Sequence, residues 1–275
     1  MSNTIARTAV PAPAASGIGR RVASTIAQAV PTLLLIVITL VIWEVAVRLM
    51  KIPHFVIPTP TSIAMELVNK QKALGYAAFI TAEEILYGFM LSAVVGVLMA
   101  LIIVRFERFG KAVYPLMVLF QNVPKIALAP LFILWFGYNL EPKILLIVVM
   151  AFFPISLNML VGLRSADPNL IALMRSVGAS RNEILRRVQI PNSLPYLMAG
   201  LKVGITLSVI GAIVGEFAGA SAGLGYMIQF ASTQMETALV FAALVEVSVL
   251  GVLFYYAVEL LERRYITWAP NSNGG

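Results

Sequence analysis

Residues 85–104 read ILYGFMLSAVVGVLMALIIV, a run of twenty positions without a charged side chain. An α-helix rises about 1.5 Å per residue, so this run reaches about 30 Å, the thickness of the hydrocarbon core of a bilayer. In lipid, each backbone N–H and C=O group needs a partner within the protein, and a helix supplies these partners locally. The stretch therefore predicts a helix that crosses a membrane.

Apolar stretches of similar length recur along the chain, which is 60% hydrophobic and only 12% charged. A soluble domain would carry roughly twice that charged fraction. We therefore expect an all-α, polytopic membrane protein with about six transmembrane helices. The expected spans lie at about 30–50, 77–104, 112–136, 144–163, 196–218 and 237–260. The third span contains Pro124 and Pro130, which interrupt a regular helix.

The residue inventory argues against an enzyme. Cysteine is absent, which excludes disulfides and thiolate metal sites. The single histidine, His54, lies in an expected loop and removes most metal and general-base chemistry. Neither metalloprotease spacing nor a phosphate-binding Gly-Lys-Ser/Thr sequence occurs. We expect no metal and no cofactor on this chain, and any ATP hydrolysis must belong to another polypeptide.

The net charge of +7 has a topological meaning here. Six spans place both termini on one side, and that side receives most of the Lys and Arg residues. These are Arg7, Arg20, Arg21, Arg105, Arg108, Lys111, Arg164, Arg175, Arg181, Arg186, Arg187, Arg263 and Arg264. The other side has Arg48, Lys51, Lys70, Lys72 and Lys143. The positive-inside rule then predicts cytoplasmic termini, and it accounts for the basic charge without a nucleic-acid partner.

Three regions follow from this arrangement. Residues 1–28, rich in Ala, Ser and Pro, are expected to form a disordered cytoplasmic tail, although a cleaved transit peptide has the same composition. Residues 29–265 form the transmembrane domain, which includes a cytoplasmic segment at 164–195. Residues 266–275 form a C-terminal tail.

The cytoplasmic segment predicts two short helices joined by a hinge. Asp167 followed by a proline is a helix start, and Gly178 is suited to a left-handed helix end. Ser180 and Glu183 have the spacing of a capping box for the second helix. Pro191 and Pro195 are expected to end it.

Two uses of this helix pair are open. The arginines of a solvated loop can touch anionic lipid headgroups. Alternatively, a short rigid helix with Ile184 and Leu185 flanked by arginines can seat in a groove of a cytoplasmic partner.

The stretch 178–191, GASRNEILRRVQIP, resembles the cytoplasmic loop of binding-protein-dependent ABC importer permeases. The family pattern is Glu-Ala-Ala, three residues, Gly, nine residues, then Ile-x-Leu-Pro. Its second half is matched by Gly178, Val188, Ile190 and Pro191. Its opening triplet falls on residues 172–174, Ala-Leu-Met, so the family's acidic residue is missing at Ala172.

Further blocks are similar to the nitrate/sulfonate/taurine branch of these permeases. They are Ile57–Pro60, Val123–Pro130, Leu134–Gly137, Gly215-Glu216 and Gly223–Gly225. The resemblance implies a permease in the bacterial inner membrane that works with a second copy, two cytoplasmic ATPase subunits holding ATP, and an extracytoplasmic solute-binding protein. It also implies that the helix after Gly178 couples the permease to the ATPases. The coupling residues are then Gly178, Ala179, Ser180, Arg181, Glu183, Ile184, Leu185, Arg186 and Pro191.

Charges at membrane depth are costly and are therefore candidates for function. Lys125, Glu216 and Glu246 fall within expected spans, where they either line a translocation path or form internal ion pairs. Glu84, near a span end, is expected to reach water. Glycines at helical spacing in the fifth span, at 200, 204, 211, 215 and 219, predict a close packing seam within the chain or across a dimer.

Two other functions compete with the importer permease. A secondary transporter that works without an ATPase should show corresponding interrupted helices in its two halves, and only the third span is interrupted here. A structural scaffold leaves the helix pair and Lys125 unexplained. The resemblance suggests a small solute such as a sulfonate, nitrate, or an aromatic or vitamin-precursor molecule.

Overall fold

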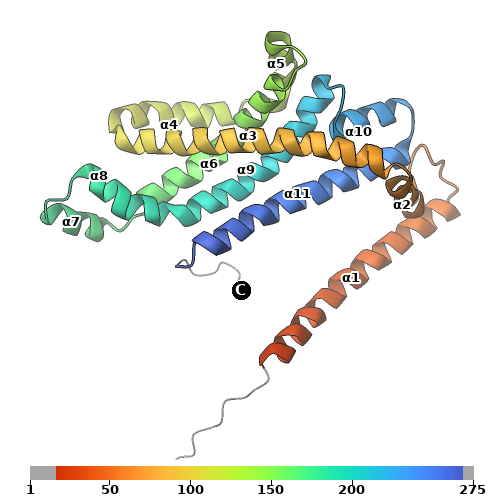
Figure 1. Cartoon of the computed structure of the whole chain (residues 1–275), viewed down its shortest axis with the longest axis horizontal. Coiled ribbons are helices and arrows are strands. Elements are labelled where there is room, and N and C mark those ends of the chain that lie inside the picture. Colours follow the sequence, from red (N-terminus) through yellow and green to blue (C-terminus); the bar gives the residue numbers. More distant parts are fainter. Residues whose placement is uncertain (1–16, 269–275) are drawn as a thin grey trace, which may run out of the picture.

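The computed structural model describes the backbone of residues 17–268 and the side chains of residues 30–106 and 108–268. This part of the chain is folded into helices with no strand (Figure 1). The helices are α1 Gly17–Leu49, α2 Pro60–Asn69, α3 Gln71–Arg105, α4 Glu107–Gln121, η1 Lys125–Leu128, α5 Ala129–Phe136, α6 Glu141–Arg164, α7 Pro168–Ser176, α8 Arg181–Ile184, η2 Leu185–Gln189, α9 Ile190–Gly219, α10 Leu224–Thr233 and α11 Thr237–Tyr265.

The predicted all-α membrane fold is confirmed. Within residues 17–268, five helical segments are long and apolar enough to cross a membrane: 30–49 of α1, α3, α6, the continuous helix 181–219, and α11. The expected third span is a bent pair in which 108–121 and 125–136 meet at 88°. Pro124 explains the break, because proline lacks a backbone N–H and disfavours helical geometry in the residue before it.

Helix α6 forms the centre of the bundle, packed between α3 and α9. The glycine seam of α9 lies against α6 from Gly200 to Gly215 and against Ile133 of α5 at Gly219, so the seam is within the chain. A Cβ at Gly211 would lie 3.1 Å from Cα of Ile147, and one at Gly200 would lie 3.1 Å from Cα of Ile155. In lipid, helices associate largely through this kind of close backbone packing.

Helix α1 is attached mainly at its C-terminal end and otherwise runs away from the bundle (Figure 1). There the ring of Trp43 lies 5.7 Å from that of Phe241, and the Glu44 carboxylate accepts from the Thr61 N–H at 3.0 Å. Residues 1–16 of the expected tail lie outside the described residues, and 17–28 belong to α1.

Two short helices, α2 and α10, lie outside the expected spans. Helix α2 begins after Thr59, whose side chain accepts from the Ser62 N–H, with Pro60 in the first turn. Helix α10 follows Gly223 and buries Leu224 and Ile228. Neither helix is long enough to span a membrane, and their apolar residues do not stand out in a chain that is apolar throughout.

The expectation that Pro191 and Pro195 end the second cytoplasmic helix is wrong. Helix α8 continues through η2, a π-helical turn, into α9, which contains both prolines. A proline ring in a regular helix clashes with the carbonyl four residues earlier. The wider π turn just before α9 leaves room for the Pro191 ring, so α8 and the fifth span form one continuous helix, called the rod below.

Candidate coupling and translocation elements

The predicted start and hinge of the helix pair at 168–184 are confirmed. The Asp167 side chain accepts from the Asn169 N–H at 2.8 Å and caps α7. Gly178 has φ +80°, and its N–H donates to the Arg175 carbonyl at 3.0 Å. The Ser180 hydroxyl accepts from the Glu183 N–H at 3.3 Å, while the Glu183 carboxylate accepts from the Ser180 N–H at 2.8 Å. The ends of these two helices are therefore determined by residues close to one another in the sequence.

The surface that the helix pair presents differs from the one expected. Ile184 is only 5% exposed, and Leu185 packs against the apolar cluster formed by α3, α4 and α6. Helix α7 buries none of its residues, and Leu173 and Val177 next to the hinge are 60% and 72% exposed. The reason is the continuous rod: because α8 extends α9, its apolar face turns inward. Apolar contacts with a partner are available on α7.

The rod is braced against neighbouring spans at the same end of the bundle. The Arg181 guanidinium donates to the Val104 carbonyl of α3 at 3.0 Å. The Gln189 amide donates to the Leu163 carbonyl of α6 at 3.2 Å, and the Asn192 amide donates to the Gly162 carbonyl at 2.9 Å. The segment is thus hydrogen-bonded to α3 and α6 and continuous with α9. Arg186 is exposed beside it.

A second set of residues forms a buried polar cluster at the opposite end of α6: Thr81, Glu84, Lys143 and Glu216. Lys143 Nζ lies 2.5 Å from Glu84 Oε1, and both side chains are buried. The Thr81 hydroxyl lies 2.6 Å from Glu216 Oε1 and accepts from the Leu224 N–H at 2.8 Å. The cluster therefore joins α3, α6, α9 and α10.

The glycine-rich loop before α10 closes over this cluster. The Gly225 N–H donates to the Glu216 carboxylate. Gly223 has φ +115°, and a Cβ there would overlap the Glu216 carboxyl group. Position 223 therefore requires glycine for two reasons: its φ is positive, and a side chain there would collide with Glu216. The loop thus covers the Glu216 carboxylate.

The three predicted intramembrane charges have different environments. Glu216 is 0% exposed and fully engaged in the cluster. Lys125 is half-buried at the break between α4 and α5, where its ammonium donates to the Gln121 carbonyl at 3.2 Å. Glu246 is half-buried in α11, and the described residues offer it no hydrogen bond or ion pair. Among those residues, neither acid forms an ion pair with Lys125.

Sequence reasoning missed three members of the cluster, because Thr81 was not singled out at all. Glu84 was expected to reach water and is 1% exposed, and Lys143 was expected outside the membrane between two spans and is 9% exposed. The pairing of Glu84 with Lys143 spans 59 positions, which no local pattern reports. One signal was present: the buried Thr81, Gly88, Ser92 and Gly96 form a stripe of small residues along α3 in which Glu84 lies.

Comparison with known proteins decides the family. The family described as binding-protein-dependent transport system inner membrane component matches residues 92–267. The chain belongs to this family. It is the membrane-spanning permease of an ABC importer and not an enzyme, and the alternative of a secondary transporter gains no support.

Several relatives are similar over most or half of the permease. A formylaminopyrimidine transport permease protein from Halalkalibacterium halodurans is 37% identical over 88% of this chain and 96% of its own. A riboflavin transport system permease protein from Chloroflexus aurantiacus is 32% identical over 85% and 88%. A taurine transport system permease protein from Escherichia coli is 30% identical over 56% of each chain.

Solved structures confirm the fold of the permease. An inward-facing methionine ABC transporter matches with a TM-score of 0.57 at 22% identity, covering 70% of this chain and 94% of that one. An amino acid ABC transporter matches with a TM-score of 0.58 at 17% identity, covering 73% and 97%.

Proposed function

We propose that the permease works as a pair of identical chains in a bacterial inner membrane, with two cytoplasmic ATPase subunits and an extracytoplasmic solute-binding protein. ATP is bound and hydrolysed by the ATPases, and this chain binds no cofactor. The observation that carries the proposal is the exposed α7 followed by a rod that is braced on α3, α6 and α9. The chain has no nucleotide-binding sequence of its own, so the force that moves α7 and the rod must come from a partner subunit.

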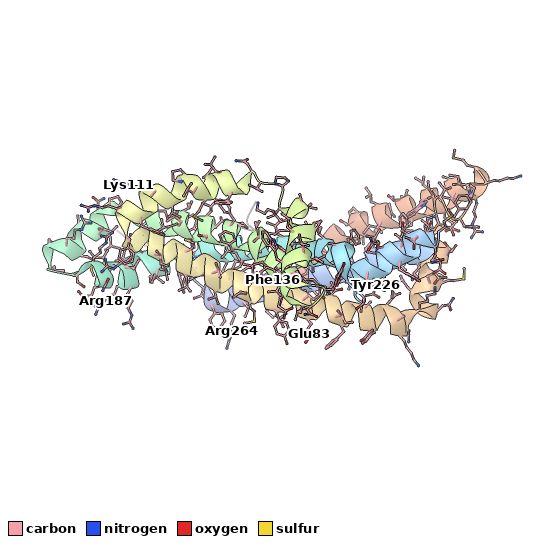
Figure 2. The ribbon with its side chains drawn as sticks, turned by 90° about the horizontal axis from the view of Figure 1, so that it is seen from above. Glu83, Lys111, Phe136, Arg187, Tyr226 and Arg264 are labelled. Atoms are coloured by element: carbon pink, nitrogen blue, oxygen red, sulfur yellow. The ribbon has the colours of Figure 1, made fainter. Side chains whose placement is uncertain are left out.

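The orientation follows from the charge distribution. Lys111 and Arg187 lie at the end of the bundle that carries α7 and α8, as Figure 2 shows. Because cytoplasmic segments retain Lys and Arg, we assign this end, together with both termini, to the cytoplasm. The loop between α1 and α2 and helix α10 then face the binding protein.

We propose a division of labour within the coupling segment. The exposed Leu173 of α7 and Val177, which directly follows α7, contact the ATPase. Gly178, Ala179 and Ser180 set the angle between α7 and the rod. The rod itself, from Arg181 through Glu183, Ile184, Leu185 and Arg186 to Pro191, passes the motion into the membrane. The predicted coupling residues are retained, but Ile184 and Leu185 are now assigned to packing inside the bundle and not to contact with the partner.

The second copy is proposed from the broken third span. On α5 and the turn after it, Leu134, Trp135 and Tyr138 are 78%, 65% and 76% exposed, next to a backbone that is not helical at residues 122–124. Irregular backbone at membrane depth is tolerated only against protein or a water-filled cavity. A second chain and the path between the two chains supply both environments.

The substrate proposed is a small polar organic solute. Relatives named for formylaminopyrimidine, riboflavin and taurine define that class. Lys125 and Glu246 are proposed to face the path, because a charge within a span is stable only where it meets water or a polar group. Glu216 is proposed to hold the structure instead.

Lys125→Met is expected to reduce ATP-dependent uptake several-fold while the thermal midpoint of the complex changes little. Lys125 forms one hydrogen bond to a carbonyl of its own chain and no ion pair among the described residues, so its removal leaves no buried charge. The assay uses the complete transporter in proteoliposomes with labelled formylaminopyrimidine, riboflavin and taurine.

Lys72→Met, an exposed lysine at the far end of α3, serves as the matched control and should transport normally. Normal uptake by Lys125→Met would remove this residue from the path. Uptake by the unaltered protein without ATP, or without its ATPases, would contradict the proposed function itself.

A further inference from the structure

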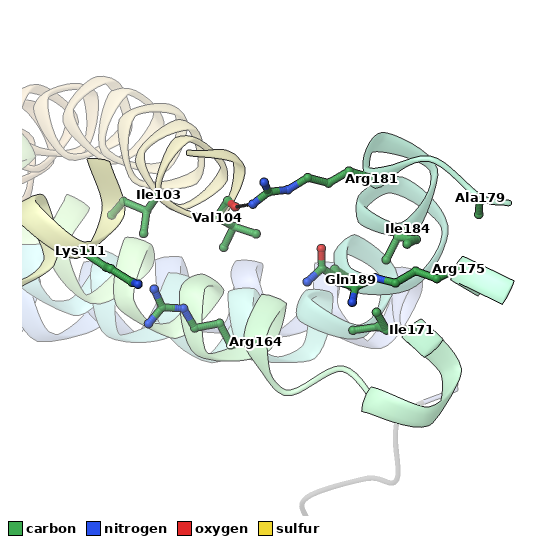
Figure 3. A pocket seen from close by; sticks show the side chains of 10 residues that line it. All are labelled: Ile103, Val104, Lys111, Arg164, Ile171, Arg175, Ala179, Arg181, Ile184 and Gln189. Carbon is green, nitrogen blue, oxygen red and sulfur yellow. Dashed lines mark hydrogen bonds between the residues drawn. The ribbon is translucent and has the colours of Figure 1, made fainter. Parts of the chain in front are cut away.

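A cavity of about 430 Å³ opens at the proposed cytoplasmic end, partly between residues of the coupling segment. It lies between the end of α3, the start of α4, the end of α6 and the α7–α8 pair. Figure 3 shows the ten residues that line it: Ile103, Val104, Lys111, Arg164, Ile171, Arg175, Ala179, Arg181, Ile184 and Gln189. Its volume falls in the roughly 300–1,000 Å³ range of small-molecule sites.

Among the described residues that line this cavity, four are cations and none is an acid. Arg181 is engaged with the Val104 carbonyl, so the argument rests on the other three. The Arg164 guanidinium lies 5.8 Å from the centre of the Tyr114 ring, which holds it in place without neutralising it. No ion pair of Lys111, Arg164 or Arg175 occurs among the residues whose side chains are described. Figure 3 shows the head groups of Lys111 and Arg164 directed toward the same space.

Like charges gathered around one cavity repel each other unless an anion lies between them. Two guanidinium groups present planar pairs of donors that match the oxygens of a phosphate, and a lysine adds a compact charge. The other walls are apolar, formed by Ile103, Ile171 and Ile184. The site therefore combines phosphate-binding groups with a surface that accepts hydrocarbon.

We propose that this pocket binds a phosphate group, namely that of an anionic phospholipid headgroup. The source is indicated by position: the pocket is formed where α3 and α6 end, the level at which a span meets the headgroups, and basic pockets between spans on the cytoplasmic side suit anionic lipids. Free phosphate would form the same contacts with the cations but would make no contact with the apolar wall of isoleucines. A bound phosphate would link α7, through Arg175, to α4 and α6.

The test compares the purified full-length permease with two double variants of equal charge. Arg164→Gln with Arg175→Gln removes two cations from the pocket. Arg263→Gln with Arg264→Gln removes two cations from the end of α11, on the same side of the membrane and outside the pocket. Native mass spectrometry in an uncharged detergent counts bound lipid as short-chain phosphatidylglycerol is titrated, with phosphatidylcholine and inorganic phosphate as separate arms.

We expect saturable binding of phosphatidylglycerol that the pocket variant weakens roughly tenfold or more, because charge-assisted hydrogen bonds are lost. The α11 variant should bind within about twofold of the unaltered protein, and high salt should weaken binding. If inorganic phosphate binds in a pocket-dependent manner and phosphatidylglycerol does not, the pocket is a phosphate site but the proposal that a lipid supplies the phosphate is overturned.

Equal binding by all three proteins, or equal binding of phosphatidylcholine, would overturn the proposal. So would loss of ATPase association in the pocket variant with lipid binding unchanged, which would assign these arginines to the partner. The thermal midpoint without lipid reports whether each variant is folded, and Lys111→Gln gives a milder version of the same test.

Discussion

Lys143→Met is expected to destabilise the permease by about 3–5 kcal/mol, because it leaves a buried carboxylate without its counter-ion. Lys143 Nζ and Glu84 Oε1 are 2.5 Å apart, and the two side chains are 11% and 2% exposed. Glu216 lies in the same cluster, so the variant would hold two acids and no base. Thermal unfolding of the detergent-solubilised complex measures the loss.

The permease provides a matched control for this prediction. Lys202 and Glu262 also lie 2.5 Å apart, with side chains 20% and 27% exposed. This pair is less buried than Lys143 and Glu84, and Lys202→Met should therefore cost less, about 1 kcal/mol. Adding Glu84→Gln to Lys143→Met should recover much of the lost stability. Equal losses for both lysines, or no rescue, would show that the cluster does not stabilise the bundle.

Gly178→Val is expected to abolish or strongly reduce uptake while the spans remain assembled. Gly178 has φ +80°, and a Cβ there would meet no atom within 4 Å, so the cost comes from the backbone conformation alone. That cost is about 1–2 kcal/mol, and a branched side chain raises it. The hinge should relax to another angle, and α7 should point away from its partner. ATP hydrolysis should continue without uptake, or the ATPases should co-purify poorly.

Gly75→Val separates backbone conformation from added bulk. Gly75 lies in α3, and a Cβ there also meets no atom within 4 Å, but its backbone is helical. This variant should retain uptake close to that of the unaltered protein. Full uptake and full ATPase association by Gly178→Val would instead make 168–191 a lipid-facing loop.

Much of the architecture follows from the sequence because it rests on local signals. Span length is read directly from apolar runs such as 85–104, and a bilayer permits little else. The caps at Asp167 and Ser180 and the hinge at Gly178 depend on residues within a few positions of one another. The break of the third span follows from Pro124.

Other features depend on contacts between distant residues. The link between Thr81 and Glu216 spans 135 positions, so Glu216 could be recognised as a buried charge but not as the group that the loop before α10 covers. Ile184 reads as an exposed anchor on a short helix, yet the continuous rod turns it inward. In a chain that is apolar throughout, hydrophobicity does not distinguish the face of a helix that is buried in the bundle from the face that contacts lipid.

One measurement tests the proposed coupling most directly. The chain has no cysteine, so a single cysteine at Val177, directly after α7, can be cross-linked to a partner without background from this chain. We expect Val177→Cys to cross-link to an ATPase subunit in membrane vesicles, with a yield that changes on addition of ATP. Tyr76→Cys, 67% exposed at the opposite end of the bundle, should react only with a reagent supplied from outside the cell. A Val177→Cys protein that never reaches the ATPase, or that is labelled from outside, would contradict the account.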